Sequence, residues 1–199
     1  MHLLQLVDDL WRDLDRLSRM GASPADILFD PAAWVVATYR LGRALFSLPA
    51  PLRAPLLFLH RPLAMALQLF TGVELPVAAE IGGGLYLAHT GGIRISPQAR
   101  IGRDCNVSRG VRVRGSPLIG DRVYLGPGAR VEGSVRVGND AAVGANSVVR
   151  RDIPDGAAVG STRPLRMVRG RQRPPLADQL RAWLRNILPR PTQLLLRTG

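Results

Sequence analysis

Histidine is the side chain best suited to moving protons near neutral pH, and this 199-residue chain contains three. His2 lies at the start of the chain and His60 lies in an apolar stretch, and neither has neighbours that suggest a catalytic group. His89 stands in the segment Leu-Ala-His-Thr-Gly-Gly, where a regular sequence repeat is interrupted. A neutral imidazole is able to accept a proton near neutral pH, so His89 is the histidine of this chain that is a candidate for acid–base chemistry. A histidine with only a structural role is the alternative.

The repeat that His89 interrupts has a period of six residues. Leu75, Ile81 and Leu87 begin it, and the register then slips by two residues before Ile95. From there an aliphatic residue recurs at every sixth position, namely Ile95, Ile101, Val107, Val113, Ile119, Leu125, Val131, Val137, Val143 and Val149. This period fits neither an α-helix nor an isolated strand, and it predicts a parallel β-helix built from hexapeptide repeats. Three hexads make one triangular coil, so residues 75–154 predict a little over four coils.

The interior of such a coil is narrow, and mostly small or β-branched residues recur four places after the aliphatic residues. Cys105, the single cysteine of the chain, falls on one of these inward positions. We therefore interpret it as a packing residue and not as a reactive thiol, because a buried free cysteine behaves as a small hydrophobe. One cysteine also excludes an intramolecular disulfide.

The remaining sequence divides the chain into three parts. Residues 1–72 have helical apolar spacing and helix starts at Ser23-Pro24 and Asp30-Pro31, and we interpret them as an α-helical cap and assembly domain. Residues 73–170 form the β-helix domain, and residues 171–199 form a basic amphipathic C-terminal tail. The fold class is thus mainly β repeat with α flanks. We expect the tail to dock on the protein, and peripheral contact with a membrane surface is the alternative.

Composition limits the partners and the compartment. The net charge of +12 favours an anionic partner, but there is no recognition-helix pattern and little aromatic interleaving, so nucleic acid is disfavoured. A phosphate-bearing small molecule suits the clustered arginines better. No secretory signal is visible, and the longest apolar stretch, 54–70, is shorter than a spanning helix, so we expect a cytoplasmic protein.

Four segments of the repeat have a recognisable sequence, namely Gly84-Leu-Tyr-Leu-Ala-His-Thr-Gly-Gly-Ile and residues 95–102, 119–129 and 145–155. Together they resemble the serine O-acetyltransferase family of hexapeptide-repeat acyltransferases. The resemblance implies a left-handed parallel β-helix, assembled as a homotrimer or a dimer of trimers, with acetyl-CoA in a groove between neighbouring prisms. It also implies that His89 is the general base of a direct transfer, in which an acceptor hydroxyl attacks the thioester without a covalent enzyme intermediate.

The resemblance and the repeat together nominate further site residues. Arg109 is expected one coil beyond His89 on the same face, where it is a candidate for the acceptor site or part of a solvated basic face. Small residues on successive coils are candidates to contact the pantetheine arm, although turn geometry also explains them: Gly126, Gly128, Gly144 and Ala145. Arg163 and Arg166 are candidates to bind the phosphates of CoA. No metal is expected.

The sequence also departs from that family. The aspartate that the family carries before the histidine is replaced by Ala88, and Ser116 stands where the family has a second histidine in a Gly-rich insertion that this chain lacks. We therefore predict an acetyl-CoA-dependent O-acetyltransferase whose acceptor is a sugar or a polysaccharide precursor. The alternatives are a serine O-acetyltransferase of cysteine biosynthesis and a non-catalytic hexapeptide-repeat scaffold. A zinc hydratase of the γ-carbonic anhydrase type needs several histidine ligands, which one repeat-borne histidine cannot supply.

Overall fold

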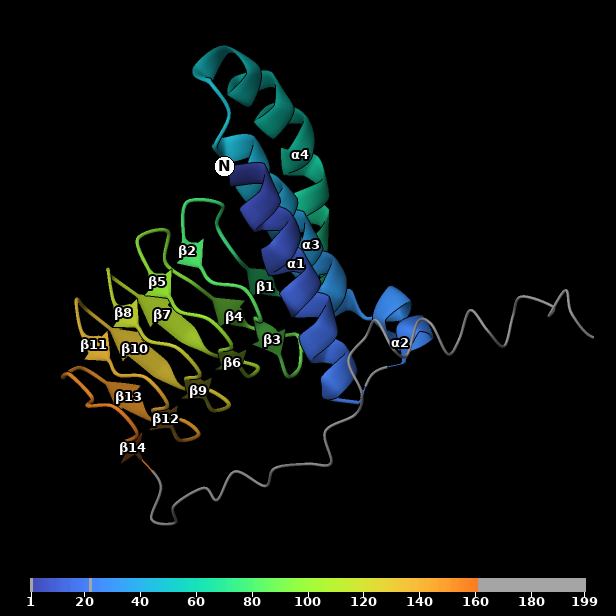
Figure 1. Ribbon diagram of the computed structural model, residues 1–199. Helices are drawn as coiled ribbons and strands as arrows, with labels where there is room; N and C mark the ends of the chain where they lie inside the picture. Colours follow the sequence, from blue (N-terminus) through green and yellow to red (C-terminus); the bar gives the residue numbers. More distant parts are fainter. Residues whose placement is uncertain (1, 22, 161–199) are drawn as a thin grey trace, which may run out of the picture.

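Four helices and fourteen short strands make up the computed structural model, which describes residues 2–21 and 23–160. The helices are α1 (His2–Arg19), α2 (Pro24–Phe29), α3 (Pro31–Phe46) and α4 (Ala50–Thr71). Figure 1 shows them together at one end of the stacked strands, with α1 and α3 nearer to the strands and α4 on the outside. Arg163, Arg166 and the C-terminal tail, 171–199, lie outside the described residues.

Both predicted helix starts are confirmed. Ser23 caps α2 with a capping box, in which its hydroxyl accepts from Asp26 N and the Asp26 carboxylate accepts from Ser23 N. The carboxylate of Asp30 caps α3 by accepting a hydrogen bond from Ala32 N at 2.9 Å. Proline follows each cap at the first helical position, where its missing N–H is not needed.

The strands form three parallel sheets that are the three sides of one prism. Sheet A contains β1 (Val73–Glu74), β4 (Ile93–Arg94), β7 (Arg112–Arg114), β10 (Arg130–Glu132) and β13 (Val148–Val149). Sheet B contains β2 (Glu80–Ile81), β5 (Arg100–Ile101), β8 (Leu118–Ile119) and β11 (Arg136–Val137). Sheet C contains β3 (Tyr86–Leu87), β6 (Asn106–Val107), β9 (Tyr124–Leu125), β12 (Ala142–Val143) and β14 (Ala158–Val159). From β1 to β10 each strand pairs with the third strand after it, as a parallel β-helix requires, whereas β12 pairs with β14.

Strand pairing confirms the predicted register slip. Tyr86 in β3 pairs with Asn106, twenty residues later, whereas Arg94 in β4 pairs with Arg112, eighteen residues later. The two extra residues therefore lie between β3 and β4, in the loop that carries His89.

The predicted number of coils was too small. The stack has about five turns, because β14 and an isolated bridge between Val137 and Ile153 continue it. In this last turn Ala142 pairs with Ala158, only sixteen residues later. The turn is two residues short, so the six-residue pattern no longer marks its inward positions.

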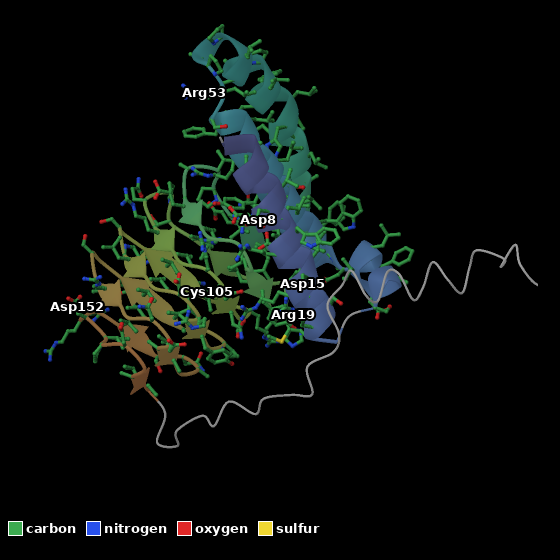
Figure 2. The ribbon with its side chains drawn as sticks, viewed as in Figure 1. Asp8, Asp15, Arg19, Arg53, Cys105 and Asp152 are labelled. Carbon is green, nitrogen blue, oxygen red and sulfur yellow. The ribbon has the colours of Figure 1, made fainter. Side chains whose placement is uncertain are left out.

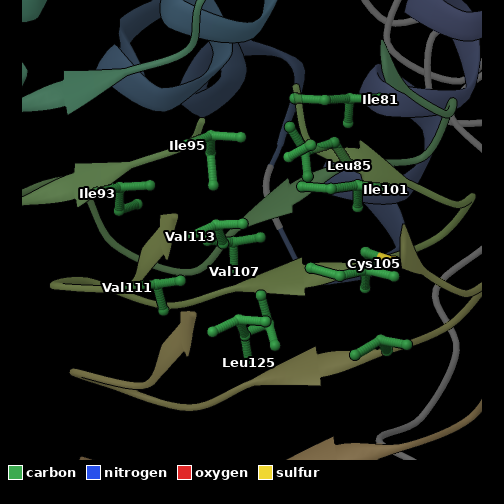
Figure 3. Packing of buried hydrophobic residues seen from close by; sticks show 14 of the residues in the cluster. Ile81, Leu85, Ile93, Ile95, Ile101, Cys105, Val107, Val111, Val113 and Leu125 are labelled. Carbon is green, nitrogen blue, oxygen red and sulfur yellow. The ribbon is translucent and has the colours of Figure 1, made fainter. Parts of the chain in front are cut away.

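The interior of the prism is a continuous apolar column (Figure 3). Its fully buried side chains include Ile93, Val107, Val111, Val123, Leu125, Val131, Val137 and Val143. Cys105 lies in this column, as predicted, with its Sγ 3.2 Å from the carbonyl oxygen of Gly120. Burial raises the pKa of the Cys105 thiol to about 11, so the group is protonated at neutral pH and a poor nucleophile.

A buried polar group joins the helices to the first coil. Arg40 in α3 pairs with Asp13 in α1 and also donates to the carbonyl oxygens of Ile81 (2.6 Å) and Gly82 (2.7 Å). The Asp13 carboxylate accepts from Leu85 N at 2.8 Å. Because these groups bond to the backbone directly before β3, they fix where the helices sit relative to the loop that follows β3.

Candidate functional site

His89 lies at the corner of the prism between sheets C and A. Ala88 N still donates to Val107 O in the regular ladder, and the chain then leaves the face before Ile93 resumes an inward position. Gly91 and Gly92 between them have φ values of 116° and 66°, which favour glycine. The side chain of His89 is exposed in the single chain.

Beside this corner is a cavity of about 280 Å³ between the helices and sheet C. Its polar lining comes from Asp30, Tyr86, His89 and Thr90. Its apolar lining comes from Leu17, Met20, Ala32, Leu87 and Ala88. The cavity therefore combines an imidazole from the β-helix with a carboxylate from the helical layer.

Asp30 is the site residue that the sequence interpretation missed. Only one of its oxygens, Oδ1, is the acceptor for Ala32 N in the helix cap, and a carboxylate has capacity for further donors. Burial raises the pKa of the Tyr86 hydroxyl, the negative charge of Asp30 raises it further, and the charge of Arg16 opposes that rise. The sequence showed an N-cap aspartate at this position, but the packing of helices on the coils is what brings it to His89.

Arg109 and the four small residues follow His89 along the same corner. Gly110 N donates to Gly91 O, and Gly128 N donates to Arg109 O, so successive coils stack directly at this edge. The side chain of Arg109 is exposed and is not part of the cavity lining. The structure thus aligns Arg109 with the corner of His89 without bringing it into the cavity.

Coil stacking by itself accounts for the glycines at this corner. A Cβ added to Gly126 would lie 2.8 Å from Val143 O and 2.9 Å from Ala145 N, and one added to Gly144 would lie 3.1 Å from Gly160 C. Gly128 has a φ of 71°. Gly144 is buried, whereas Ala145 is exposed. These four residues therefore present backbone groups and little side-chain bulk along one edge of the prism, and an extended ligand can lie against such a surface.

A larger groove lies elsewhere on the described structure. It measures about 1090 Å³ and runs along sheet B beneath α1 and the end of α3. It shares no lining residue with the cavity of His89. Within the described ranges, no group of three or more His, Cys, Asp or Glu side chains is gathered in the manner of metal ligands. The helices described here include none with the length and apolar character needed to cross a membrane.

Comparison with known proteins places this geometry in a family. Residues 116–151 match the family model described as bacterial transferase hexapeptide (six repeats). The chain is 35% identical over 144 residues to a serine acetyltransferase of Helicobacter pylori, and the match covers 68% of this chain and 81% of that protein. The chain belongs to the serine acetyltransferase family. It is therefore an acyltransferase, as the sequence resemblance predicted.

Solved structures of this family share the fold. A serine acetyltransferase of Neisseria gonorrhoeae in complex with serine is 26% identical, with a TM-score of 0.67 over 81% of this chain and 69% of that chain. A serine acetyltransferase in complex with CoA is 24% identical, with a TM-score of 0.64 over 77% of this chain and 66% of that chain, and compares in fold alone. The predicted left-handed parallel β-helix with N-terminal helices is confirmed.

Proposed function

We propose that this protein is an acetyl-CoA-dependent O-acetyltransferase whose acceptor is the hydroxyl group of L-serine. The observation that supports this proposal is that Asp30 and His89 line one small cavity. A carboxylate can bind the ammonium group of an amino acid, while an imidazole nitrogen accepts a hydrogen bond from its hydroxyl group. A neutral sugar has no cation for which Asp30 is needed.

The sugar acceptor predicted from the sequence is not confirmed, and the serine alternative has better support. That prediction rested on the carboxylate missing at Ala88 and the histidine missing at Ser116. Asp30 places a carboxylate in the cavity from another part of the chain. The relatives agree with this view, since the H. pylori protein is a serine acetyltransferase and the N. gonorrhoeae enzyme was solved with serine. Ala88 keeps the sugar hydroxyl as the second candidate, because the imidazole has no carboxylate directly beside it in sequence.

The proposed reaction is a direct transfer. A ring nitrogen of His89 accepts the hydroxyl proton as the acceptor oxygen forms a bond to the thioester carbonyl carbon. The carbon–sulfur bond of acetyl-CoA then breaks, and His89 returns the proton to the departing thiolate, so that CoA and the O-acetyl ester leave the site. General base catalysis of this kind contributes roughly 10²–10⁴-fold to the rate.

The co-substrate is proposed to lie along the corner that runs on from His89. Gly126, Gly128, Gly144 and Ala145 offer backbone groups and little side-chain bulk to a pantetheine arm. Arg163 and Arg166 remain proposals for the phosphates, and Arg109 remains one for the acceptor side. Because His89 is exposed in one chain, we further propose that a neighbouring prism in a homotrimer or a dimer of trimers covers it and excludes water.

The test is release of free thiol from acetyl-CoA by the purified protein with L-serine and with sugar and nucleotide-sugar acceptors. We expect turnover with L-serine that falls by about 10²-fold or more in His89→Ala. Gln98→Ala, in an exposed turn of another corner, is the matched control and should keep the wild-type rate. Turnover with sugars alone would favour the second candidate, and activity that survives in His89→Ala would exclude the proposed base. No acceptor-dependent thiol with any acceptor would support the scaffold alternative.

A further inference from the structure

Helix α4 exposes an unusually large apolar surface. Its side chains Phe58, Leu69 and Phe70 are 81%, 79% and 90% exposed. Further exposed apolar residues of the same helix are Leu52, Leu56, Leu59, Leu63 and Met65. Single exposed apolar residues are ordinary, but a contiguous set of this size indicates a surface that another body covers.

The pattern within α4 shows that this surface is almost the whole outward side of the helix. The inward side includes Leu57, His60, Ala64 and Leu67, which line a cavity against α3 and the start of the β-helix, and His60 Nε2 lies 2.9 Å from Thr38 O. The exposed residues Arg61 and Gln68 also line this cavity, so they lie between the inward side and the outward side of the helix. Ordinary amphipathic helices place polar residues opposite such an inward row. In α4 the opposite side is also apolar, so the helix lacks the polar solvent-facing side of an ordinary amphipathic helix.

The few polar residues of α4 are also distinctive. The helix has no aspartate or glutamate, and its charged side chains are Arg53 and Arg61. Arg61 is exposed, while Arg53 lies over the ring of Phe46 at 5.2 Å. No ion pair with a described acidic residue is formed by either arginine. The apolar surface is therefore accompanied by positive charge alone.

Position makes this surface accessible. Figure 1 shows α4 on the side of α1 and α3 that faces away from the β-helix, and Figure 2 shows its side chains projecting outward along its length, with Arg53 labelled at the end of the helical layer. The helix has 22 residues, which corresponds to a rod of roughly 33 Å. None of the described helices qualifies as a membrane span, so the face would rest on a partner and not pass through it.

We propose that the outward face of α4 docks on the surface of an anionic lipid bilayer. Phenylalanine, leucine and methionine side chains would enter the boundary between headgroups and acyl chains, and Arg61 would contact lipid phosphates. Charge complementarity favours this occupant over a second copy of the same face. A symmetric pair of α4 helices brings arginines toward arginines with no carboxylate on either helix, whereas an anionic leaflet supplies the missing negative charge.

The proposal is tested by sedimentation of the full-length protein with phosphatidylcholine vesicles, with and without phosphatidylglycerol. We expect binding that needs phosphatidylglycerol and weakens with salt. The double variant F58E/L69E should lower the partition coefficient by at least about tenfold, because two large side chains can no longer enter the bilayer. Arg61→Gln should lower it about fivefold. Both glutamates replace exposed side chains, and far-UV circular dichroism checks that the fold is kept.

Val148→Glu is the matched control, since Val148 is an exposed apolar residue of sheet A, far along the chain from α4. It should bind vesicles as the wild type does. Equal binding by F58E/L69E and wild type would place the attachment outside α4, for example in the tail 171–199, and would overturn the proposal. Equal binding to both kinds of vesicle would refute the role of charge. Light scattering that shows a smaller assembly for F58E/L69E, together with no vesicle binding by wild type, would assign the face to a second copy instead.

Discussion

Asp13 of α1 and Arg40 of α3 form an ion pair, with 2.8 Å between Oδ2 and Nε, in which the side chains are only 1% and 4% exposed. Burial raises the pKa of the Asp13 carboxyl, and the hydrogen bond and charge of Arg40 oppose that rise. Each partner also bonds to backbone of the first coil, Arg40 to two carbonyl oxygens and Asp13 to an amide. The pair thus connects two helices and the strand that precedes His89.

Removing one partner of this pair should destabilise the protein strongly. Asp13→Ala leaves the guanidinium of Arg40 buried without its carboxylate, and we expect a loss of about 3–5 kcal/mol in the free energy of unfolding. Denaturation in guanidinium chloride measures it. Asp8→Ala on the same helix is the matched control, because the Asp8–Arg12 pair is exposed and its loss should leave the unfolding midpoint nearly unchanged. Equal midpoints for the two variants would show that the buried pair is not what holds the helices to the coil.

Cys105 should make the protein less stable at high pH. Burial raises the pKa of its thiol from 9.0 to about 11, so the folded protein keeps a proton that the unfolded chain loses. This contribution is complete below pH 9.0 and is lost as the pH rises through about 11, amounting to roughly 3 kcal/mol. The measurement is the difference in unfolding free energy between wild type and Cys105→Ala across that pH range. This difference separates the contribution of the Cys105 thiol from the ionisation of the tyrosines, which both proteins share. A difference that stays constant with pH would contradict the prediction.

The β-helix could be predicted from the sequence because each inward position repeats a local requirement. Val107, Leu125 and Val143 stack at the same place in successive coils, and each must fit the same narrow interior. The two-residue slip was visible for the same reason, since it shifts a pattern that is otherwise regular. The short last turn was not, because Ile153 arrives two residues early and only one strand follows it.

The composition of the cavity could not be predicted in the same way. Asp30 belongs to the helices, whose position on the coils depends on the buried pair of Asp13 and Arg40 and on the Tyr39 hydroxyl, which donates to Ala79 O at 2.7 Å. Such contacts join residues that are far apart in the chain, so they produce no repeating pattern in the sequence. The exposed side of α4 was hidden for a related reason, since an apolar helix in a sequence does not reveal which of its sides is covered.

Asp30 should control the acceptor and not the co-substrate. Asp30→Asn removes the negative charge and keeps a side chain that caps α3 equally well, so the fold should be unaffected. We expect kcat/KM for L-serine to fall about 10–100-fold, mainly through KM, because a charge-assisted hydrogen bond to the ammonium group is lost. The KM for acetyl-CoA should stay the same. Asp152→Asn, an exposed carboxylate outside the cavity, is the control. An unchanged KM for L-serine would remove the main argument for an amino-acid acceptor.

The register slip should be needed for activity and not for folding. Deleting Thr90 and Gly91 leaves Ala88-His89-Gly92-Ile93, which has the form of the regular corner Ser108-Arg109-Gly110-Val111. Gly92 already has a φ of 66°, close to the 73° of Gly110, so the shortened corner can close without new backbone strain. His89 would then take the exposed position that Arg109 holds in the next coil, outside the cavity.

We therefore expect the deletion variant to unfold cooperatively in a thermal melt and to lose about 10²-fold or more of its acceptor-dependent thiol release, as His89→Ala does. Thr90→Ser, which keeps the length of the loop, is the control and should retain most of the activity. Full activity in the deletion variant would mean that a histidine at the regular corner serves as well. The two extra residues would then have no part in presenting His89, and the interruption of the repeat would be a packing feature of the first coil alone.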